Sequence, residues 1–527
     1  MLLYHGSSLT QGPGLCLFVY TNDFRFEWRS KVRRYSHDII VIGGGAGGLS
    51  VASGCAQLGM KTALIEREHM GGDCLHYGCV PSKTLLHVAG QFAAAREVAS
   101  LSRITAAAPQ PDMMAINARI TAVINTIAYH DSPQRFRSLG AEVFLGSGSF
   151  TLPNEVEVNG EHLSAKTIVI ATGSRAAIPP IEGLAEAGYL TNRDVFSLPE
   201  LPRSLAILGA GPIGVELGQA FSRLGSSVTI IDMAARILPR DDGEMSAIVS
   251  AQLEREGVHT IMNATAVRVA PGGRKKVIQL SVADGSGASR SQTVSADQIL
   301  VAAGRQANTD SLNTAAAGLE LGPRGYVPVD ASLRSNVRHI YAVGDSNGTY
   351  PFTHVAGAEA AVVVRRAALH AGGRMNYRTV PWVSYTYPEI AHVGHSEESA
   401  AREGIRHRVV RQSFSGVDRA HAEAASEGLL KIIVDRRDRV LGVQIAAAGA
   451  GELLAPALHA VGRKWKLSAF RTAMTPYPTM SEVFGRAVSA QLAPKLFNPR
   501  ARRILRALFR YRGSGPHAAA SAAAHGE

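Results

Sequence analysis

The sequence predicts an α/β fold with two Rossmann-like domains, and a duplicated glycine pattern is the main reason. The β-branched run at 38–42 leads into the glycines of 43–48, and the run at 205–208 leads into those of 209–214. In each copy a later β-branched run ends in an acid, Glu66 or Asp232, 23 residues after the first glycine. A strand, a glycine turn, a helix and a distant acid are typical of a dinucleotide-binding unit.

Each glycine in the pattern has a separate physical task. The first permits a tight turn, the second lets a pyrophosphate approach the backbone, and the third lets helix and strand pack closely. The phosphates then meet the free N–H groups at the helix N-terminus. A single copy could be a flexible turn, but two matched copies indicate two nucleotide sites. The glycines are Gly43, Gly45 and Gly48 in the first copy and Gly209, Gly211 and Gly214 in the second.

The charge of the chain lies mainly at its two ends. The 527 residues allow three or more domains, and the formal net charge is +12. Nine of these charges belong to residues 1–36 and 495–527, so the middle is close to neutral and a nucleic-acid groove is not expected. Four cysteines are too few for a secreted disulfide framework, which favours a reducing, cytoplasmic location.

Both ends differ in composition from the middle. Residues 1–36 are interpreted as a disordered extension or an overlong start, with an organelle-targeting segment as the weaker alternative. Residues 497–527 predict a basic amphipathic helix with Ile504, Leu505 and Leu508 on one face, followed by a disordered tail. Such a helix could lie on a membrane surface or dock on its own protein or a partner subunit.

Two cysteines separated by four residues, Cys74 and Cys79, are the strongest chemical signal in the sequence. They could not form a disulfide across an undistorted helix, but Gly78 and Pro81 predict a distortion. A zinc site would need two further ligands at matching spacing, and the nearby histidines are not arranged as a second pair. A redox-active pair is therefore favoured over zinc ligands, and no metal site is expected; inert thiols remain the other alternative.

The segment from Cys74 to Lys83, with both glycine patterns in this order, resembles the class I pyridine nucleotide-disulfide oxidoreductases. This family includes dihydrolipoamide dehydrogenase, glutathione reductase and mercuric reductase. The resemblance covers about residues 37–490 and is carried also by the stretches 168–174, 300–305, 341–345, 352–356 and 380–389. It implies an FAD-binding domain at 37–183 and 307–376, an NAD(P)-binding domain at 184–306, and a C-terminal α+β dimerisation domain at 377–496 of a homodimer.

The resemblance also implies roles for individual residues. Electrons would pass between nicotinamide, FAD and the cysteine pair, with Cys79 nearest the flavin and Cys74 exchanging with substrate. Lys83 and Glu216 would form a pair that tunes the flavin, although a surface lysine and a helix glutamate are the simpler alternative. The FAD-binding residues implied are Gly43, Gly45, Gly48, Glu66, Lys83, Thr172, Gly173, Asp345 and His354. Those for NAD(P) are Gly209, Gly211, Gly214, Asp232 and Gly304.

The nicotinamide preference rests on Asp232. An acid at this position accepts bonds from a free ribose 2′-hydroxyl and repels a 2′-phosphate. The sequence therefore favours NAD(H) over NADP(H), although Arg236 nearby leaves NADP(H) open.

One position departs from the reductase pattern. The family's catalytic histidine belongs to a segment resembling H-P-T-x-S-E, and here it is replaced by Tyr477, while Glu482, which would orient the base, is kept. A tyrosine pKa near 10, against about 6.5 for histidine, makes proton removal at neutral pH harder by about 5 kcal/mol. Tyr477 is thus a poor base, although it can donate a hydrogen bond or contact a bound metal ion.

Three functions are compatible with these observations. The first is an NAD(P)H-dependent reductase of a disulfide or metal ion, since Tyr477, Thr479, Met480 and Glu482 match a mercuric reductase pattern. No C-x-x-C precedes residue 37 and no cysteine follows Cys79, so efficient mercury handling is not expected. The second is a dihydrolipoamide dehydrogenase, and the third is a flavin redox sensor recruited to membranes by the basic helix.

Overall fold

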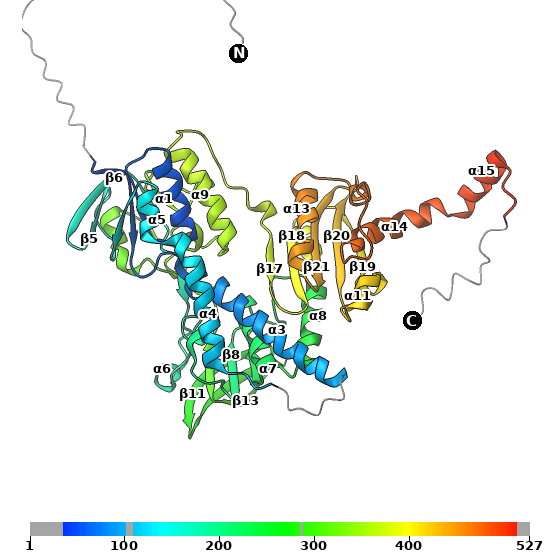
Figure 1. The fold of residues 1–527 in the computed structure, drawn as a ribbon, viewed down its shortest axis with the longest axis horizontal. Coiled ribbons are helices and arrows are strands. Elements are labelled where there is room, and N and C mark those ends of the chain that lie inside the picture. The colour runs from blue at the N-terminus through cyan, green and yellow to red at the C-terminus, as the bar shows by residue number, and fades with distance from the viewer. Residues whose placement is uncertain (1–34, 102–108, 285–287, 514–527) are drawn as a thin grey trace, which may run out of the picture. The chain divides into compact units, whose positions relative to one another are not determined.

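The computed structural model describes residues 35–101, 109–284 and 288–513 (Figure 1). The predictions for the N-terminal extension and for the tail after residue 513 therefore lie almost wholly outside the described residues. No helix in the described ranges is both long enough and apolar enough to cross a membrane.

The first sheet is parallel at its centre and antiparallel at one side. Strands β3, β2, β1, β6 and β16 are parallel neighbours, and the long strand β6 also pairs antiparallel with β5, which pairs with β4. Their bounds are β1 (His37–Ile42), β2 (Thr62–Glu66), β3 (Ala141–Leu145), β4 (Ser149–Leu152), β5 (Glu155–Val158), β6 (Glu161–Ile170) and β16 (Ile340–Ala342). The first glycine pattern follows β1, as predicted.

Both faces of this sheet are buried, which explains the continuous apolar run of β1. Ile39 and Val41 pack with helices α1 (Ala46–Gln57) and α9 (Thr353–Ala367), whereas Ile40 and Ile42 contact the layer that contains β4 and β5. Helices α1 and α9 lie side by side (Figure 1), and a Cβ at Gly54 would meet Val364 at 2.9 Å, so the helices pack closely there.

The second sheet is fully parallel, in the order β10, β9, β8 and β14, and an antiparallel meander, β11 to β13, covers one of its faces. The bounds are β8 (Ser204–Leu208), β9 (Ser227–Ile231), β10 (His259–Ile261), β14 (Gln298–Val301), β11 (Ala264–Gly272), β12 (Lys275–Ala283) and β13 (Ser289–Ala296). Strands β7 (Ser174–Ala176) and β15 (Arg305–Ala307) form a separate antiparallel pair. The second glycine pattern follows β8, as predicted.

A helical hairpin connects the cysteine pair to the second sheet. Helices α3 (Cys79–Leu101) and α4 (Met113–Ala128) belong to the same apolar core as α7 (Pro212–Leu224), α8 (Gly243–Arg255) and strand β8. This packing brings the start of α3 into contact with α7, although the two helices are far apart in sequence. The remaining helices of this part are α2 (Gly72–His76), α5 (Pro133–Ser138) and α6 (Leu184–Ala187).

The third sheet is antiparallel, in the order β17, β18, β21, β20 and β19. These strands are β17 (Trp382–Ser384), β18 (Glu389–Gly394), β19 (His407–Ser413), β20 (Leu429–Asp435) and β21 (Val440–Ala447). Helices α13 (Ala455–Gly462) and α14 (Glu482–Leu496) share its apolar core. The other C-terminal helices are α10 (Glu397–Arg402), α11 (Asp418–Ala422), α12 (Ala450–Leu453) and α15 (Pro499–Phe509).

Candidate active site

A break between two helices brings the cysteines together. Cys74 lies in α2, and Cys79 is the first residue of α3. Tyr77 and Gly78 separate the two helices. A Cβ at Gly78 would lie 3.0 Å from the Asp73 carbonyl oxygen, so the backbone approaches closely at this glycine. Both cysteines are free thiols whose side chains form a hydrogen bond. The predicted distortion at Gly78 is confirmed.

The surroundings make the two thiols unequal. The hydrogen bond from Cys74 lowers the pKa of Cys79 to about 6, helped by the charge of Lys83 and the hydroxyl of Thr353, against burial and the charge of Glu216. The position of Cys79 at the N-terminus of α3 also favours a thiolate. The same hydrogen bond, together with burial, raises the pKa of Cys74. These surroundings therefore favour the thiolate at Cys79 and the protonated thiol at Cys74.

Lys83 and Glu216 form the pair that the resemblance implied. The Lys83 Nζ donates to Glu216 Oε2 at 2.7 Å, and the other carboxylate oxygen accepts from the Tyr385 amide at 2.8 Å. The Lys83 ammonium also lies 4.3 Å from the centre of the Tyr385 ring. These contacts join α3, α7 and the segment after β17, so the lysine is held beside Cys79 rather than exposed to solvent as a simple surface residue.

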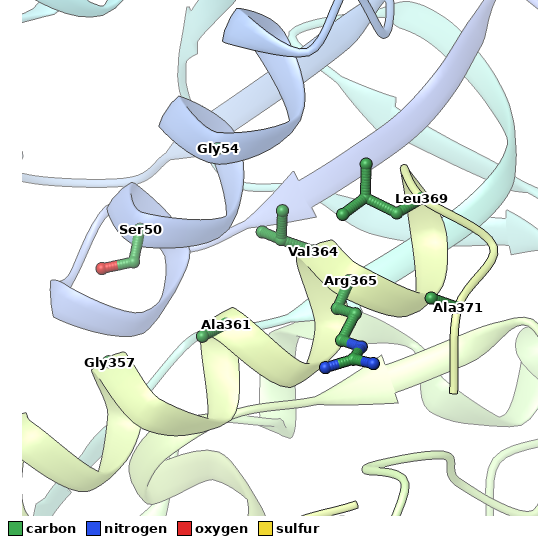
Figure 2. A pocket seen from close by; sticks show the side chains of 8 residues that line it. All are labelled: Ser50, Gly54, Gly357, Ala361, Val364, Arg365, Leu369 and Ala371. Carbon is green, nitrogen blue, oxygen red and sulfur yellow. The ribbon is translucent and has the colours of Figure 1, made fainter. Parts of the chain in front are cut away.

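One cavity brings the cysteine pair together with other predicted site residues. Its walls include seven predicted residues, namely Gly45, Cys74, Cys79, Lys83, Gly173, Glu216 and Asp345. They also include Thr353 and Arg305, which the sequence did not single out. A different groove, between α1 and α9, is lined mostly by small or apolar residues and contains none of the predicted residues (Figure 2). The cavity at the cysteines is therefore the candidate active site.

The first glycine loop has the geometry needed to hold a pyrophosphate. Gly43 has a φ of +111°, and a Cβ there would lie 2.3 Å from the Ala171 carbonyl oxygen. A Cβ at Gly48 would lie 1.8 Å from the Gly43 carbonyl oxygen, so α1 can pack on β1 only with glycine. Gly45 begins α1 without a side-chain cap, which leaves the helix amides to face the cavity. Glu66 braces the turn by accepting from the Gly44 amide at 2.6 Å.

A polar group beside this loop supports binding of FAD. The hydroxyl of Thr172 is buried and has no hydrogen-bond partner within the described part of the chain, as expected for a group that meets a ligand. The residues present therefore fit the cofactor that the resemblance implied.

Asp345 lies in a connected polar network on the same wall. It accepts from the Ser174 hydroxyl at 2.5 Å, and Ser174 in turn accepts from Arg305 Nε at 2.6 Å. Arg305 also donates to Asp73 at 2.9 Å, next to Cys74. Burial raises the pKa of Asp345, against the opposing effects of Arg305 and Ser174. Arg305 thus ties the cysteine loop to the wall that carries Asp345.

The structure places His354 differently from the expectation. Its Nε2 lies 2.8 Å from the Pro381 carbonyl oxygen and its ring stacks on Phe352, so it is not among the residues that line the cavity. The neighbouring Thr353 does line the cavity, and its hydroxyl lies 3.8 Å from the Cys79 sulfur. Helix α9 begins at Thr353, and the side chain that faces the cysteines is this threonine.

The second glycine loop repeats the first. A Cβ at Gly214 would lie 1.9 Å from the Gly209 carbonyl oxygen, and Gly209 has a φ of +121°. Gly211 begins α7 without a side-chain cap. Asp232 accepts from the Ala210 amide at 2.6 Å, which places its carboxylate at this loop. The loop is built to receive a second dinucleotide.

Two further residues lie near the second loop. One guanidinium nitrogen of Arg236, Nη2, donates to the carbonyl of Asp241 at 3.0 Å and pairs with Glu398 at 3.3 Å, whereas its buried Nε has no partner in the described residues. Gly304 has a φ of +122°, and a Cβ there would lie 3.1 Å from Arg324.

Tyr477 lies apart from the cysteines within the single chain. Its side chain is 68% exposed, and its hydroxyl donates to Asp418 at 3.0 Å rather than to Glu482. This hydrogen bond, and the charge of Asp418, raise the pKa of Tyr477. One oxygen of Glu482 is buried without a partner in the described residues. The acid that holds the phenol in this chain is therefore Asp418, which the sequence did not indicate.

Two dinucleotide-binding loops and a thiolate–thiol pair in one cavity define a nicotinamide- and flavin-linked dithiol oxidoreductase. Residues 37–360 match the family described as pyridine nucleotide-disulphide oxidoreductase, and residues 380–488 match the dimerisation domain of that family. This protein therefore belongs to the pyridine nucleotide-disulphide oxidoreductases. It is an FAD-containing enzyme, and the dimerisation domain supports a homodimer.

Individual relatives divide between two activities. The chain is 33% identical over 449 residues to a mercuric reductase of Bacillus cereus, covering 85% of this chain and 70% of that protein. It is also 33% identical over 484 residues to the mitochondrial dihydrolipoyl dehydrogenase 2 of Arabidopsis thaliana, covering 89% and 94%. The Cu(II) complex of the HOCl-induced flavoprotein disulfide reductase RclA from Escherichia coli is 28% identical, with a TM-score of 0.75 and coverage of 86% and 99%.

Proposed function

We propose that this enzyme uses NADH to reduce a disulfide or a thiophilic metal ion at Cys74 and Cys79. The observation that carries the proposal is the asymmetry of the pair, with a thiolate at Cys79 and a protonated thiol at Cys74. FAD, when bound, supplies two-electron transfer between the nicotinamide and this pair. The remaining steps depend on residues of the chain itself.

The two cysteines take different tasks. Cys79 is held beside the Lys83 ammonium and the Thr353 hydroxyl, which keep its negative charge on the cavity wall. Cys74 is the thiol assigned to exchange with substrate. Its hydrogen bond to Cys79 places that thiolate where it can accept the proton when Cys74 attacks, and the low pKa of Cys79 means that this transfer costs free energy.

Tyr477 favours reduction of the substrate over oxidation of a dithiol. Its hydrogen bond to Asp418 raises its pKa above an ordinary value near 10, so it stays protonated at neutral pH. A protonated phenol can donate a hydrogen bond to a departing thiolate or contact a bound ion, but it cannot take a proton from dihydrolipoamide. In a homodimer of this family, each subunit contributes the residue at this position to the active site of its partner.

The relatives support both substrate classes in the proposal. One relative is named a mercuric reductase, and a neighbour in structure is a Cu(II) complex of a disulfide reductase. Thiolates select soft metal ions. Among the described cysteines only Cys74 and Cys79 can serve, because the Cys55 side chain is fully buried in the core of the first sheet. Reduction of a metal ion also releases no thiolate that has to be protonated, which suits the absence of a histidine at position 477.

NADH is the proposed electron donor. Asp232 lies at the second glycine loop, where a carboxylate would accept from a 2′-hydroxyl and repel a 2′-phosphate. Arg236, the residue that could have favoured NADPH, is engaged with Glu398 and a carbonyl group. The low cysteine content supports a reducing compartment, and we propose the cytoplasm.

Dihydrolipoamide dehydrogenase is the second candidate, since the Arabidopsis thaliana relative is named so. The deciding experiment is an anaerobic titration of the purified protein with NADH and then NADPH, followed by a substrate panel. The panel contains lipoamide, glutathione disulfide, quinones, Hg(II) and Cu(II). We expect NADH-dependent reduction of a disulfide or a metal ion that is lost in Cys74→Ser. Rapid oxidation of dihydrolipoamide by NAD⁺, or full activity in Cys74→Ser, would contradict the proposal.

A further inference from the structure

Helix α15 exposes a large apolar surface. None of its residues is buried, and Ile504, Leu508 and Phe509 are 58%, 68% and 60% exposed. The helix begins with its own cap, because the Asn498 side chain accepts from the Ala501 amide at 2.8 Å and Pro499 occupies the first turn. The N-terminus of the helix is therefore capped by its own sequence.

The helix is divided into an apolar face and a basic face. Ile504, Leu505 and Leu508 share one side at helical spacing, while the arginines occupy the other side. The arginines of the helix are Arg500, Arg502, Arg503 and Arg506, and Arg510 follows directly after it. No aspartate or glutamate occurs between residues 483 and 526, so nothing in this stretch of sequence offsets their charge. Exposed aromatic rings, Phe497 at 76% and Tyr511 at 61%, flank the helix.

We propose that α15 docks on an anionic lipid surface. The arginines bind anionic lipid headgroups, and the apolar face is buried about 5–10 Å deep at the boundary between headgroups and acyl chains. Aromatic rings at the helix ends suit the same interface. A nucleic acid would use only the basic face. A second copy of the chain would offer little negative charge, since the part between residues 37 and 494 is close to neutral.

The test uses the full-length, FAD-loaded protein with two kinds of vesicle. One kind is pure phosphatidylcholine, and the other contains phosphatidylglycerol as well. We expect sedimentation only with the second kind, and weaker binding as salt is raised. Replacing two arginines, Arg503→Gln and Arg506→Gln, should reduce partitioning about 30-fold, from about 1 kcal/mol per charge. The matched control is Arg437→Gln with Arg463→Gln, two exposed arginines elsewhere.

The apolar face is tested separately. Leu508→Glu should abolish binding to the anionic vesicles, while Leu152→Glu, at another exposed leucine, should leave it unchanged. NADH oxidation by each variant reports that the fold is intact. Failure of the wild type to bind the anionic vesicles would overturn the proposal. So would unchanged binding in Leu508→Glu, loss of the dimer in that variant, or oligonucleotide binding that outcompetes the vesicles.

Discussion

Replacing Lys83 with methionine removes the cation beside the Cys79 thiolate. In the structure the Cys74 hydrogen bond, Lys83 and Thr353 hold the pKa of Cys79 at about 6, and Glu216 opposes them. An opposite charge within about 4–6 Å lowers a pKa by roughly 1–3 units. The variant also leaves the buried Glu216 carboxylate without its ion-pair partner, and this negative charge raises the pKa of Cys79 further. We expect the pKa of Cys79 to increase by about 1–2 units.

The increase has a large effect near neutral pH. With a pKa of about 6, about nine-tenths of Cys79 is thiolate at pH 7, whereas with a pKa of about 7.5 only about a quarter is. The assay is a pH titration of the reduced protein followed by thiolate ultraviolet absorbance, with the signal of Cys79→Ser subtracted. Lys83→Arg keeps the charge and serves as the control.

Two results would refute this reasoning. The first is the same midpoint in Lys83→Met as in the wild type. The second is a transition near pH 6 that survives in Cys79→Ser but disappears in Cys74→Ser, because the thiolate would then belong to the other cysteine.

Three further predictions concern other parts of the molecule. Tyr477→His supplies a base with an ordinary pKa near 6.5 and should raise dihydrolipoamide oxidation by about 100-fold; no gain would weaken the account of the tyrosine. Asp232→Ala should raise the KM for NADH and reduce the ratio of kcat/KM for NADH to that for NADPH, which steady-state kinetics with both cofactors would measure. Lys431→Met should cost about 3–5 kcal/mol in urea unfolding, because it strands the buried carboxylate of Asp242, and Asp242→Asn in the same chain should restore part of the loss.

The backbone features of the site were predictable because they follow from local sequence. A Cβ at Gly43, Gly48, Gly209 or Gly214 would clash with backbone atoms, and a Cβ at Gly78 would lie only 3.0 Å from a backbone oxygen. The contact of Lys83 with Glu216 could be predicted only from the resemblance, because 133 residues separate the two and no local pattern connects them.

The contacts that were missed join distant segments through side chains. Arg305 reaches Asp73 across 232 residues, and Tyr477 reaches Asp418 across 59. Periodicity and spacing report the direction of an element but not the rotamer at its end, which is why His354 was expected at the cavity and Thr353 was overlooked. A signal was present for Thr353, because it lies beside His354 in the stretch 352–356 and its hydroxyl can donate a hydrogen bond.

The central claim is that Cys74 and Cys79 exchange electrons with the bound FAD. An anaerobic reductive titration of the purified, yellow protein with dithionite tests it most directly. The wild type should take up two more electrons per chain than Cys79→Ser, since only the wild type has a disulfide to reduce beside the flavin. Equal uptake by the two proteins, or a purified protein that holds no flavin and binds none when it is added, would contradict the account.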